Sequence, residues 1–276
     1  MLPHRPTQRP AGALVALSVA LAVGSCTPSG PAPTGPTPTS PAPGPSATDA
    51  PAGDARTEVS AGDVTLEVML PGATARDGQV RVSADADTAT ATITLAATTL
   101  DADHVAGVPE IALTSPGTFE PNLDGSVTVI ADDGTTAGGL TAPRGARLVA
   151  VGRRVLEARA AEGTSDADGT GDAEDADVAT TLGTDAVEGA LWGEREGGRS
   201  LAVTPTGWTR SAGQAGVALA WAELVAADPG VGTPTMRAQL ECHAIGAPDK
   251  ATWNLEPWRP DVGLVATMAA RCNPTS

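Results

Sequence analysis

Two tryptophans and several polar side chains are crowded into a short stretch near the end of the chain, Trp253 to Arg259. Indole rings can stack on sugar rings and an arginine fork pairs well with carboxylates, so this strip could bind a glycan or an acid. The alternative is a tryptophan core sealed by a salt bridge from Arg259 to Glu256 or Glu241. The candidate binding residues are Trp253, Asn254, Glu256, Trp258 and Arg259.

A histidine directly after a cysteine, His243 after Cys242, is the second candidate. With Glu256 or Asp261 it could form an acid–base pair for hydrolysis. If Cys242 is held in a disulfide, His243 would instead pack on a helix face and form local hydrogen bonds. We keep His243 among the possible binding residues, and an envelope hydrolase that acts on cell-wall polymer stays the alternative function.

The residues offer little to a metal ion or a cofactor. Beyond the N-terminal segment the sequence has two histidines, His104 and His243, and no His-x-x-x-His pair, which argues against a zinc hydrolase. Asp101, Asp103 and His104 are more typical of a polar turn. The sequence contains neither a Gly-x-Ser-x-Gly elbow nor a P-loop. We therefore expect no metal and no cofactor.

An acidic run from 164 to 177 can be compared with calcium-binding loops. Positions one, three, six and twelve of an EF-hand loop would be Asp166, Asp168, Gly171 and Asp177. Position five, however, holds Thr170 in place of the usual Asp or Asn, and no amphipathic helices flank the run. We expect a solvated acidic loop instead.

The N-terminus predicts the compartment. Two arginines, Arg5 and Arg9, precede an apolar run from Ala11 to Val23, the layout of a secretory signal peptide that is too short for a stable membrane span. The sequence Val-Gly-Ser-Cys that ends at Cys26 resembles a bacterial lipobox. This resemblance implies that residues 1–25 are removed, that Cys26 receives a diacylglycerol, and that the chain is anchored to the extracytoplasmic face of the cell membrane.

The charge balance restricts the partners. The chain has 33 acidic and 17 basic residues, and two of the basic ones lie in the predicted signal peptide. Such a surface repels phosphate backbones, so we expect no nucleic acid partner. It also adds no attraction to anionic lipids, which leaves the acyl chains as the anchor. The expected partners are the membrane, through the lipid, and either a cell-wall polymer or another envelope protein.

Two cysteines remain once Cys26 is assigned to lipid. Cys242 and Cys272 form an even pair in a chain predicted to work in an oxidising compartment. We expect a disulfide between them, which would close a loop of about 31 residues and stabilise the fold by roughly 3–4 kcal/mol.

Composition divides the rest of the chain into three regions. Residues 26–56 are rich in Pro, Ser and Thr and predict an extended, disordered tether. Residues 57–206 contain period-2 segments such as Val64–Leu70 and Val127–Ile130, the second followed by an Asp-Asp-Gly turn, and predict an antiparallel sheet or small sandwich. The third region, 207–276, holds four of the five tryptophans.

The third region mixes helical and extended signals. Apolar spacing predicts a helix over Ala215–Ala227, which the sequence Asp-Pro-Gly should end. A second helix should start at Thr233-Pro234, a cap followed by a first-turn proline, with His243 on its apolar face. The stretch Val262–Ala270 could be strand or helix. The predicted class is therefore α+β, with a β-rich antiparallel N-terminal domain and a small, disulfide-stapled α+β domain.

The C-terminal sequence also carries a family resemblance. The blocks that matter are Trp-Asn-Leu-Glu-Pro from Trp253, Arg-Pro-Asp-Val-Gly from Arg259, and Cys-Asn-Pro from Cys272. They resemble a C-terminal domain of unknown function found in secreted actinobacterial proteins, and Ala202 to Trp208 is similar to the start of that domain. The resemblance implies a secreted domain without an established activity, so no catalytic residue can be carried over.

Overall fold

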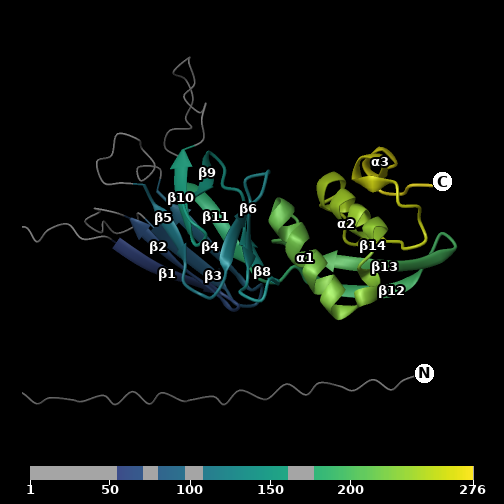
Figure 1. Ribbon diagram of the computed structural model, residues 1–276, viewed down its shortest axis with the longest axis horizontal. Helices are drawn as coiled ribbons and strands as arrows, with labels where there is room; N and C mark the ends of the chain where they lie inside the picture. Colours follow the sequence, from purple (N-terminus) through teal and green to yellow (C-terminus); the bar gives the residue numbers. More distant parts are fainter. Residues whose placement is uncertain (1–54, 71–79, 97–107, 161–176, 276) are drawn as a thin grey trace, which may run out of the picture. The chain divides into compact units, whose positions relative to one another are not determined.

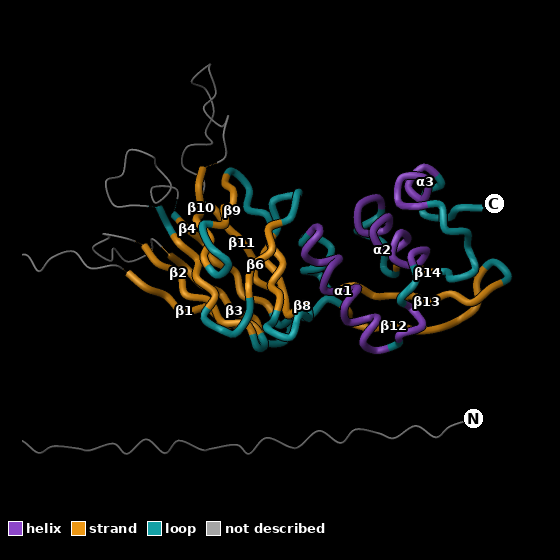
Figure 2. Tube along the Cα trace, in the orientation of Figure 1, coloured by secondary structure: helices purple, strands orange, loops and turns teal. Residues whose placement is uncertain are grey.

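The computed structural model describes residues 55–70, 80–96, 108–160 and 177–275. Within these ranges, no helix is both long and apolar enough to cross a membrane. The predicted signal peptide, Cys26, nearly all of the tether and the acidic run up to residue 176 lie outside the described residues, as do Asp101, Asp103 and His104. Figures 1 and 2 show strands through most of the described chain and helices only in its last part.

The first sheet has five antiparallel strands in the order β1-β2-β5-β10-β9. Alternation explains its faces: Val64, Leu66, Val68 and Leu70 are buried, and the residues between them are half-buried. The strand bounds are β1 Ala55–Ala61, β2 Val64–Leu70, β5 Glu110–Leu113, β9 Ala146–Ala150 and β10 Val155–Ala160.

The second sheet has six antiparallel strands in the order β3-β4-β11-β8-β7-β6. The Asp-Asp-Gly turn closes the β7–β8 hairpin as predicted, with the backbone N–H of Thr135 donating to Asp133 at 2.9 Å. The bounds are β3 Val80–Asp85, β4 Thr90–Leu95, β6 Thr118–Pro121, β7 Val127–Ile130, β8 Thr136–Leu140 and β11 Val178–Gly183.

The two sheets share one aliphatic core, which makes this part a β-sandwich. Fully buried side chains come from both sheets, among them Leu66 and Ile111 from the first and Ile93 and Leu182 from the second. Phe119 is the aromatic member of this core.

The C-terminal part is a three-stranded antiparallel sheet, β12-β13-β14, with helices packed against it. Both predicted helices are present, and the hydroxyl of Thr233 accepts from the N–H of Met236 at 3.3 Å, as expected of a cap. The ambiguous stretch after Val262 is helical. The bounds are β12 Val187–Arg195, β13 Gly198–Pro205, α1 Gly213–Ala227, η3 Pro229–Val231, α2 Pro234–Gly246, β14 Trp253–Leu255 and α3 Gly263–Ala269.

A disulfide joins α2 to the segment after α3. It links Cys242 to Cys272, whose Cα atoms are 5.6 Å apart. The second core lies between the helices and the sheet and includes Trp208, Trp253, Met236 and Leu240. The α+β class, with antiparallel sheets first and a disulfide-bonded α+β region after them, is thereby confirmed.

The sandwich caps the first helix of the C-terminal part. No side chain next to α1 in the sequence caps its N-terminus. Instead the N–H of Gln214 donates to Asp124 at 2.6 Å and the N–H of Ala215 donates to the hydroxyl of Ser126 at 3.2 Å, both on the β6–β7 side of the sandwich. Gly213, with a φ of +58°, lets the loop pass close to Asp124. Residues 49–276 accordingly form one compact unit.

Candidate functional site

The tryptophan strip begins inside the core. Trp253 lies on β14 with its side chain fully buried, and its indole N–H donates to the carbonyl of Ala247 at 3.2 Å. Asn254, the next residue, is half-buried and pairs with Ala202 of β13 in the sheet register. The first indole of the strip therefore packs the domain and does not face solvent.

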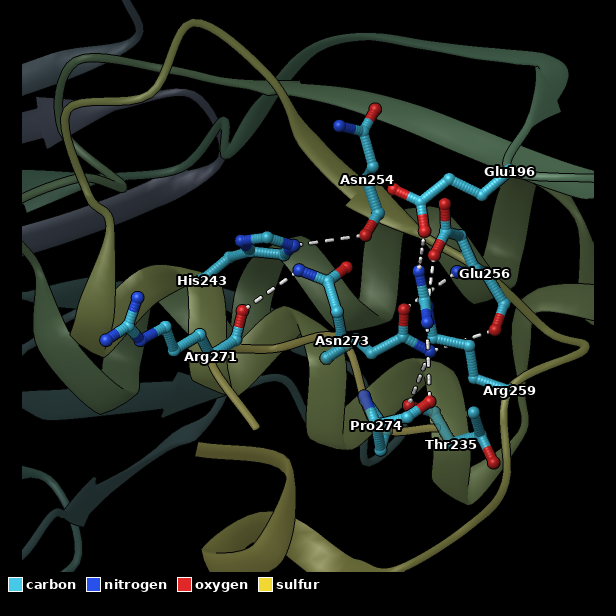
Figure 3. Close-up of polar contacts among 10 residues, drawn as sticks. Glu196, Thr235, His243, Asn254, Glu256, Arg259, Arg271, Asn273 and Pro274 are labelled. Atoms are coloured by element: carbon cyan, nitrogen blue, oxygen red, sulfur yellow. Dashed lines mark hydrogen bonds and ion pairs between the residues drawn. The ribbon is translucent and has the colours of Figure 1, made fainter. Parts of the chain in front are cut away.

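A buried arginine at the end of the strip binds three partners. The side chain of Arg259 is only 1% exposed and forms ion pairs with Glu256, which is 2% exposed, and with Glu196 at 2.6 Å. It also donates to the carbonyl of Pro274 at 3.3 Å. Figure 3 shows the guanidinium between these three partners, which come from the β12–β13 turn, the end of β14 and the C-terminal tail. Arg259 thus forms the buried salt bridge to Glu256 that the sequence offered as the alternative to a binding site.

Glu256 is also held by its backbone. The side chain of Gln239 on α2 accepts from the N–H of Glu256 at 2.9 Å and donates to its carbonyl at 2.9 Å. The side-chain amide of Gln239 therefore makes, to the residue that follows β14, the pair of hydrogen bonds that a neighbouring strand would make. The result fixes β14 against α2 and leaves the carboxylate of Glu256 pointing to Arg259.

Trp258 is the large side chain of the strip that reaches solvent, with 44% of its surface exposed. The guanidinium of Arg259 lies 4.5 Å from its ring centroid. The other close neighbour is Gly198, where a Cβ atom would lie 2.3 Å from the ring, so a glycine is needed for the indole to lie there. An exposed ring backed by a buried cation is a surface that could stack on a ligand.

His243 is packed as a neutral core residue. It is 3% exposed, and its Nε2 lies 3.1 Å from the carbonyl of Asn254, which can only accept, so Nε2 carries the proton. Its Nδ1 has no hydrogen-bond partner among the described residues. Burial lowers the pKa of His243 below its ordinary value, and the charge of Lys250 acts in the same direction.

The groups of the hydrolase alternative are not bonded to one another. No contact of His243 with Glu256 or Asp261 occurs among the described hydrogen bonds and ion pairs, and Asp261, which is exposed, accepts from the N–H of Gly263 at 3.3 Å. Glu256 is instead paired with Arg259.

One titratable residue of the C-terminal part escapes the sequence reasoning. Glu223 on α1 is half-buried and accepts from the N–H of Ala186 at 2.9 Å, in the connection between β11 and β12. Burial raises its pKa to about 7, and the nearby charge of Asp185 adds to the rise. The sequence feature that could have identified Glu223 is that it is a single acidic residue within the otherwise apolar sequence Trp-Ala-Glu-Leu-Val of a predicted helix.

The described residues also line two hollows. The larger, about 660 Å³, is lined by the β6–β7 loop, α1, α2 and α3. The smaller, about 300 Å³, is lined by Asp87, Asp185 and Glu188 beside Trp208. No group of three or more His, Cys, Asp or Glu side chains in the described part of the chain is arranged to hold a metal ion.

The comparison with known families concerns this C-terminal part. Residues 187–275 match the family described as "Protein of unknown function (DUF2599)". The C-terminal part carries a DUF2599 domain. The match begins at residue 187, which is the start of β12, and not at Ala202; this agrees with the structure, where β12 and β13 pair with β14 in one sheet. We call residues 187–275 the DUF2599 domain from here on.

Similar curated proteins are mycobacterial and uncharacterised. The chain is 43% identical over 100 residues to Uncharacterized protein Rv0477 of Mycobacterium tuberculosis, and equally to Uncharacterized protein Mb0487 of Mycobacterium bovis. These matches cover 33% of this chain and 66% of each relative. Uncharacterized protein ML2452 of Mycobacterium leprae is 39% identical over 59 residues, 20% of this chain and 48% of its own length. No solved structure matches the chain.

These findings support part of the sequence reasoning. The C-terminal resemblance to a domain without an established activity is confirmed. The predicted lipobox and the predicted signal peptide lie outside both the described residues and the family match, so the lipid anchor stays a prediction.

Proposed function

We propose that this chain is a lipid-anchored protein of the extracytoplasmic face of the cell membrane, and that its DUF2599 domain is a binding or structural module. The lipobox-like sequence at Cys26 supports the anchor, and the uncharged segment 27–48 suits a spacer between membrane and fold. The Cys242–Cys272 disulfide is in keeping with an oxidising compartment.

One observation favours binding over catalysis. Two of the groups that could do acid–base chemistry in the terminal block are held by packing, because Glu256 forms a buried pair with Arg259 and the ring of His243 bonds a backbone carbonyl; the third, Asp261, is exposed and has no described bond to His243. The aromatic side chain that the block offers to solvent is the indole of Trp258. We therefore infer that Trp258, with Asn254 nearby in sequence, forms the contact surface for a cell-wall polymer.

The polymer contact is tested by retention on cell-wall polymer. Trp258→Ala should abolish retention, because the exposed stacking face is lost. The control is Trp221→Ala, since Trp221 also lies near an arginine, Arg237, at 5.3 Å, but is less exposed than Trp258. Equal retention of wild type and Trp258→Ala would refute this contact, and a fall in both variants would indicate a general loss of packing.

The anchor is tested separately by fractionation. Cys26→Ser should move the protein from the membrane to the medium, because no thioether to lipid can form. Ser25→Ala is the control, because it keeps a small residue before the cysteine and should stay in the membrane. If Cys26→Ser remains membrane-bound, the anchor is wrong whatever the outcome of the polymer experiment.

A further inference from the structure

The C-terminal sheet has one face that points away from the helices. In an antiparallel pair, opposite residues share a face, and successive residues of a strand alternate between the two faces. Leu201 and Val203 of β13 are buried in the core that the helices cover. The residues on the other side, which we call the outer face, are Gly198, Ser200, Ala202 and Thr204 of β13, Gly189, Leu191, Gly193 and Arg195 of β12, and Asn254 of β14.

The β12 side of the outer face is not covered by the described residues. A Cβ atom added at Gly189 or Gly193 would meet no atom within 4 Å, and Leu191 between them is 77% exposed. At one end of the face lies the indole of Trp258, since a Cβ atom at Gly198 would be 2.3 Å from its ring. The outer face therefore combines an exposed aromatic ring with open backbone beside it.

Charge distinguishes the outer face from the rest of the chain. The chain has 33 acidic and 17 basic residues, yet no strand position of the outer face is acidic, and Arg195 is basic. The exposed guanidinium of Arg195 forms no ion pair or side-chain hydrogen bond with a described residue. At the end of the face, Glu196 and Glu256 are both paired with Arg259. This surface is therefore complementary to an anion, whereas an acidic surface repels one.

The free arginine and the exposed indole are neighbours. Arg195 lies opposite Gly198 in the register, and opposed residues have Cβ positions about 4.5–5.5 Å apart. Because the indole of Trp258 lies on Gly198, the stem of Arg195 starts beside the ring. A sugar ring stacked on the indole would bring a carboxylate or phosphate substituent within reach of the guanidinium, which binds both anions through its fork.

A second contact lies further along β13. Asn254 joins the outer face opposite Ala202, and its side-chain amide has no hydrogen-bond partner among the described residues. Figure 3 shows this amide pointing away from His243 and from the side chains around Arg259. From Gly198 to Ala202 the strand extends about 13 Å, which is longer than one sugar ring. A glycan that contacts both ends must present adjacent units along the strand.

A buried hydroxyl lies between the two contacts. Ser200 is 5% exposed, and its Oγ has no hydrogen-bond partner among the described residues. Unpaired buried polar groups are rare in folded proteins because each costs free energy. The residue opposite Ser200 is Gly193, whose outer side is open, so a ligand hydroxyl seated over Gly193 would lie beside this unpaired group.

We propose that the outer face binds adjacent units of an anionic glycan that lies along β13. The indole of Trp258 stacks on one sugar ring, Arg195 binds the carboxylate or phosphate of that unit, and the amide of Asn254 bonds the next unit. This inference rests on the proposed polymer contact at Trp258. It adds the chemical class of the polymer and the residues that select it.

The polymer class is tested by binding of the purified protein to one cell-wall polymer in three forms. These forms are untreated, with carboxyl groups reduced to alcohols, and with phosphodiesters removed by hydrofluoric acid. Affinity should fall about tenfold on the form that lacks the recognised anion, as expected for one lost charge-assisted contact, and the form affected identifies that anion. Equal affinity for all three forms would overturn the proposal and leave the contact at Trp258 in place.

Two arginines of one hairpin provide a matched pair of variants. Arg195→Gln should lower affinity for the untreated polymer about tenfold, because the contact to the anion is lost. Arg199→Gln removes the same charge, but Arg199 lies opposite Glu194 on the other face, 4.1 Å from the ring centroid of Trp192, and should bind as wild type does. An equal loss in both variants would show that only net charge matters, which overturns the proposal.

A side chain added at the open glycine tests the path of the glycan. Gly193→Leu should lower affinity at least about tenfold by blocking the face, and should leave the melting temperature unchanged because its Cβ atom meets no neighbour. Gly246→Leu is the control, since Gly246 is equally unobstructed but lies at the end of α2, on the helix side of the sheet. Wild-type affinity in Gly193→Leu would overturn the path along β13. Wild-type affinity in Trp258→Ala would instead contradict the proposed function, so the two failures are distinguishable.

Discussion

The two cores of this chain are stabilised in different ways. The sandwich core is aliphatic, and its buried polar side chains are small, such as Ser126, Thr128 and Thr180. The core of the DUF2599 domain contains buried tryptophan, and beside it lie the buried side chains of Gln239, His243, Glu256 and Arg259. An aliphatic core tolerates exchange of one apolar side chain for another of similar volume, whereas a buried ion pair loses its stability when either partner is removed. The domain should therefore be the region more sensitive to single polar substitutions.

The largest expected effect is at Arg259. Arg259→Ala leaves the carboxylate of Glu256 buried without its partner, and should lower the free energy of unfolding by about 3–5 kcal/mol. Arg259→Lys should recover little, since an ammonium cannot make the guanidinium fork to Glu256, Glu196 and Pro274. Urea unfolding followed by tryptophan fluorescence measures both.

The control for Arg259 is a more exposed pair on the same domain. Arg237 and Glu241 are 34% and 26% exposed, so Arg237→Ala should cost about 0–1 kcal/mol. If Arg259→Ala cost no more than this, the contrast between the two cores would fail.

The sandwich should respond differently to a conservative exchange. Leu66, fully buried on β2, should cost about 2–5 kcal/mol when cut to alanine, through lost contacts and a cavity. Leu66→Met should cost less than about 1.5 kcal/mol, because volume and apolar character are kept. Circular dichroism during urea unfolding reports these values, and an equally severe loss for methionine would show that this core is as exacting as the other.

Local patterns predicted the elements well. Alternation in Val64–Leu70 gave the strand, the Asp-Asp-Gly turn gave the hairpin, and Thr233 with Pro234 gave the start of α2. The cysteine count gave the disulfide. The strand, turn and cap signals each lie within a few residues of the structure that they specify. The disulfide could be predicted because only two cysteines remain once Cys26 is assigned to lipid.

The contacts that were missed join residues far apart in the sequence. The sequence offered Glu256 or Glu241 as partners of Arg259 but gave no reason to expect Glu196, which lies in the turn between β12 and β13. It also gave no sign that Asp124 caps α1, because a cap is normally sought next to the helix. β12 escaped assignment to the final sheet since its residues are mostly exposed and show no clean alternation.

The cap from the sandwich provides a test of how firmly the two cores are joined. Asp124→Ala removes the acceptor for the N–H of Gln214 and should cost about 1 kcal/mol, a typical value for a lost cap. Native-state hydrogen exchange should then show reduced protection in the first turn of α1. Asp133→Ala, which removes an acceptor in the exposed β7–β8 turn, should leave α1 protected. Unchanged exchange at Gln214 in Asp124→Ala would show that the cap does not join them.

The smallest expected effect concerns pH and lies within the DUF2599 domain. The pKa of Glu223 is raised to about 7 in the folded chain, from an ordinary value of 4.5. The folded state therefore binds a proton that the unfolded state has released, so stability from this group falls as pH rises from 4.5 through 7. The pKa of His243 is lowered, so the unfolded state binds its proton first, and stability from that group falls as pH drops below 6.5.

The two groups can be separated by one isosteric exchange. Glu223→Gln keeps an acceptor for the N–H of Ala186 but does not titrate. Its melting temperature should exceed that of wild type most at pH 8, and the difference should shrink toward pH 5, while the decline on the acidic side remains. Asp185→Asn, which removes only the neighbouring charge, should shift the wild-type profile in the same direction by less. Parallel profiles for wild type and Glu223→Gln between pH 5 and 8 would show that the half-buried carboxyl of Glu223 does not titrate in this range.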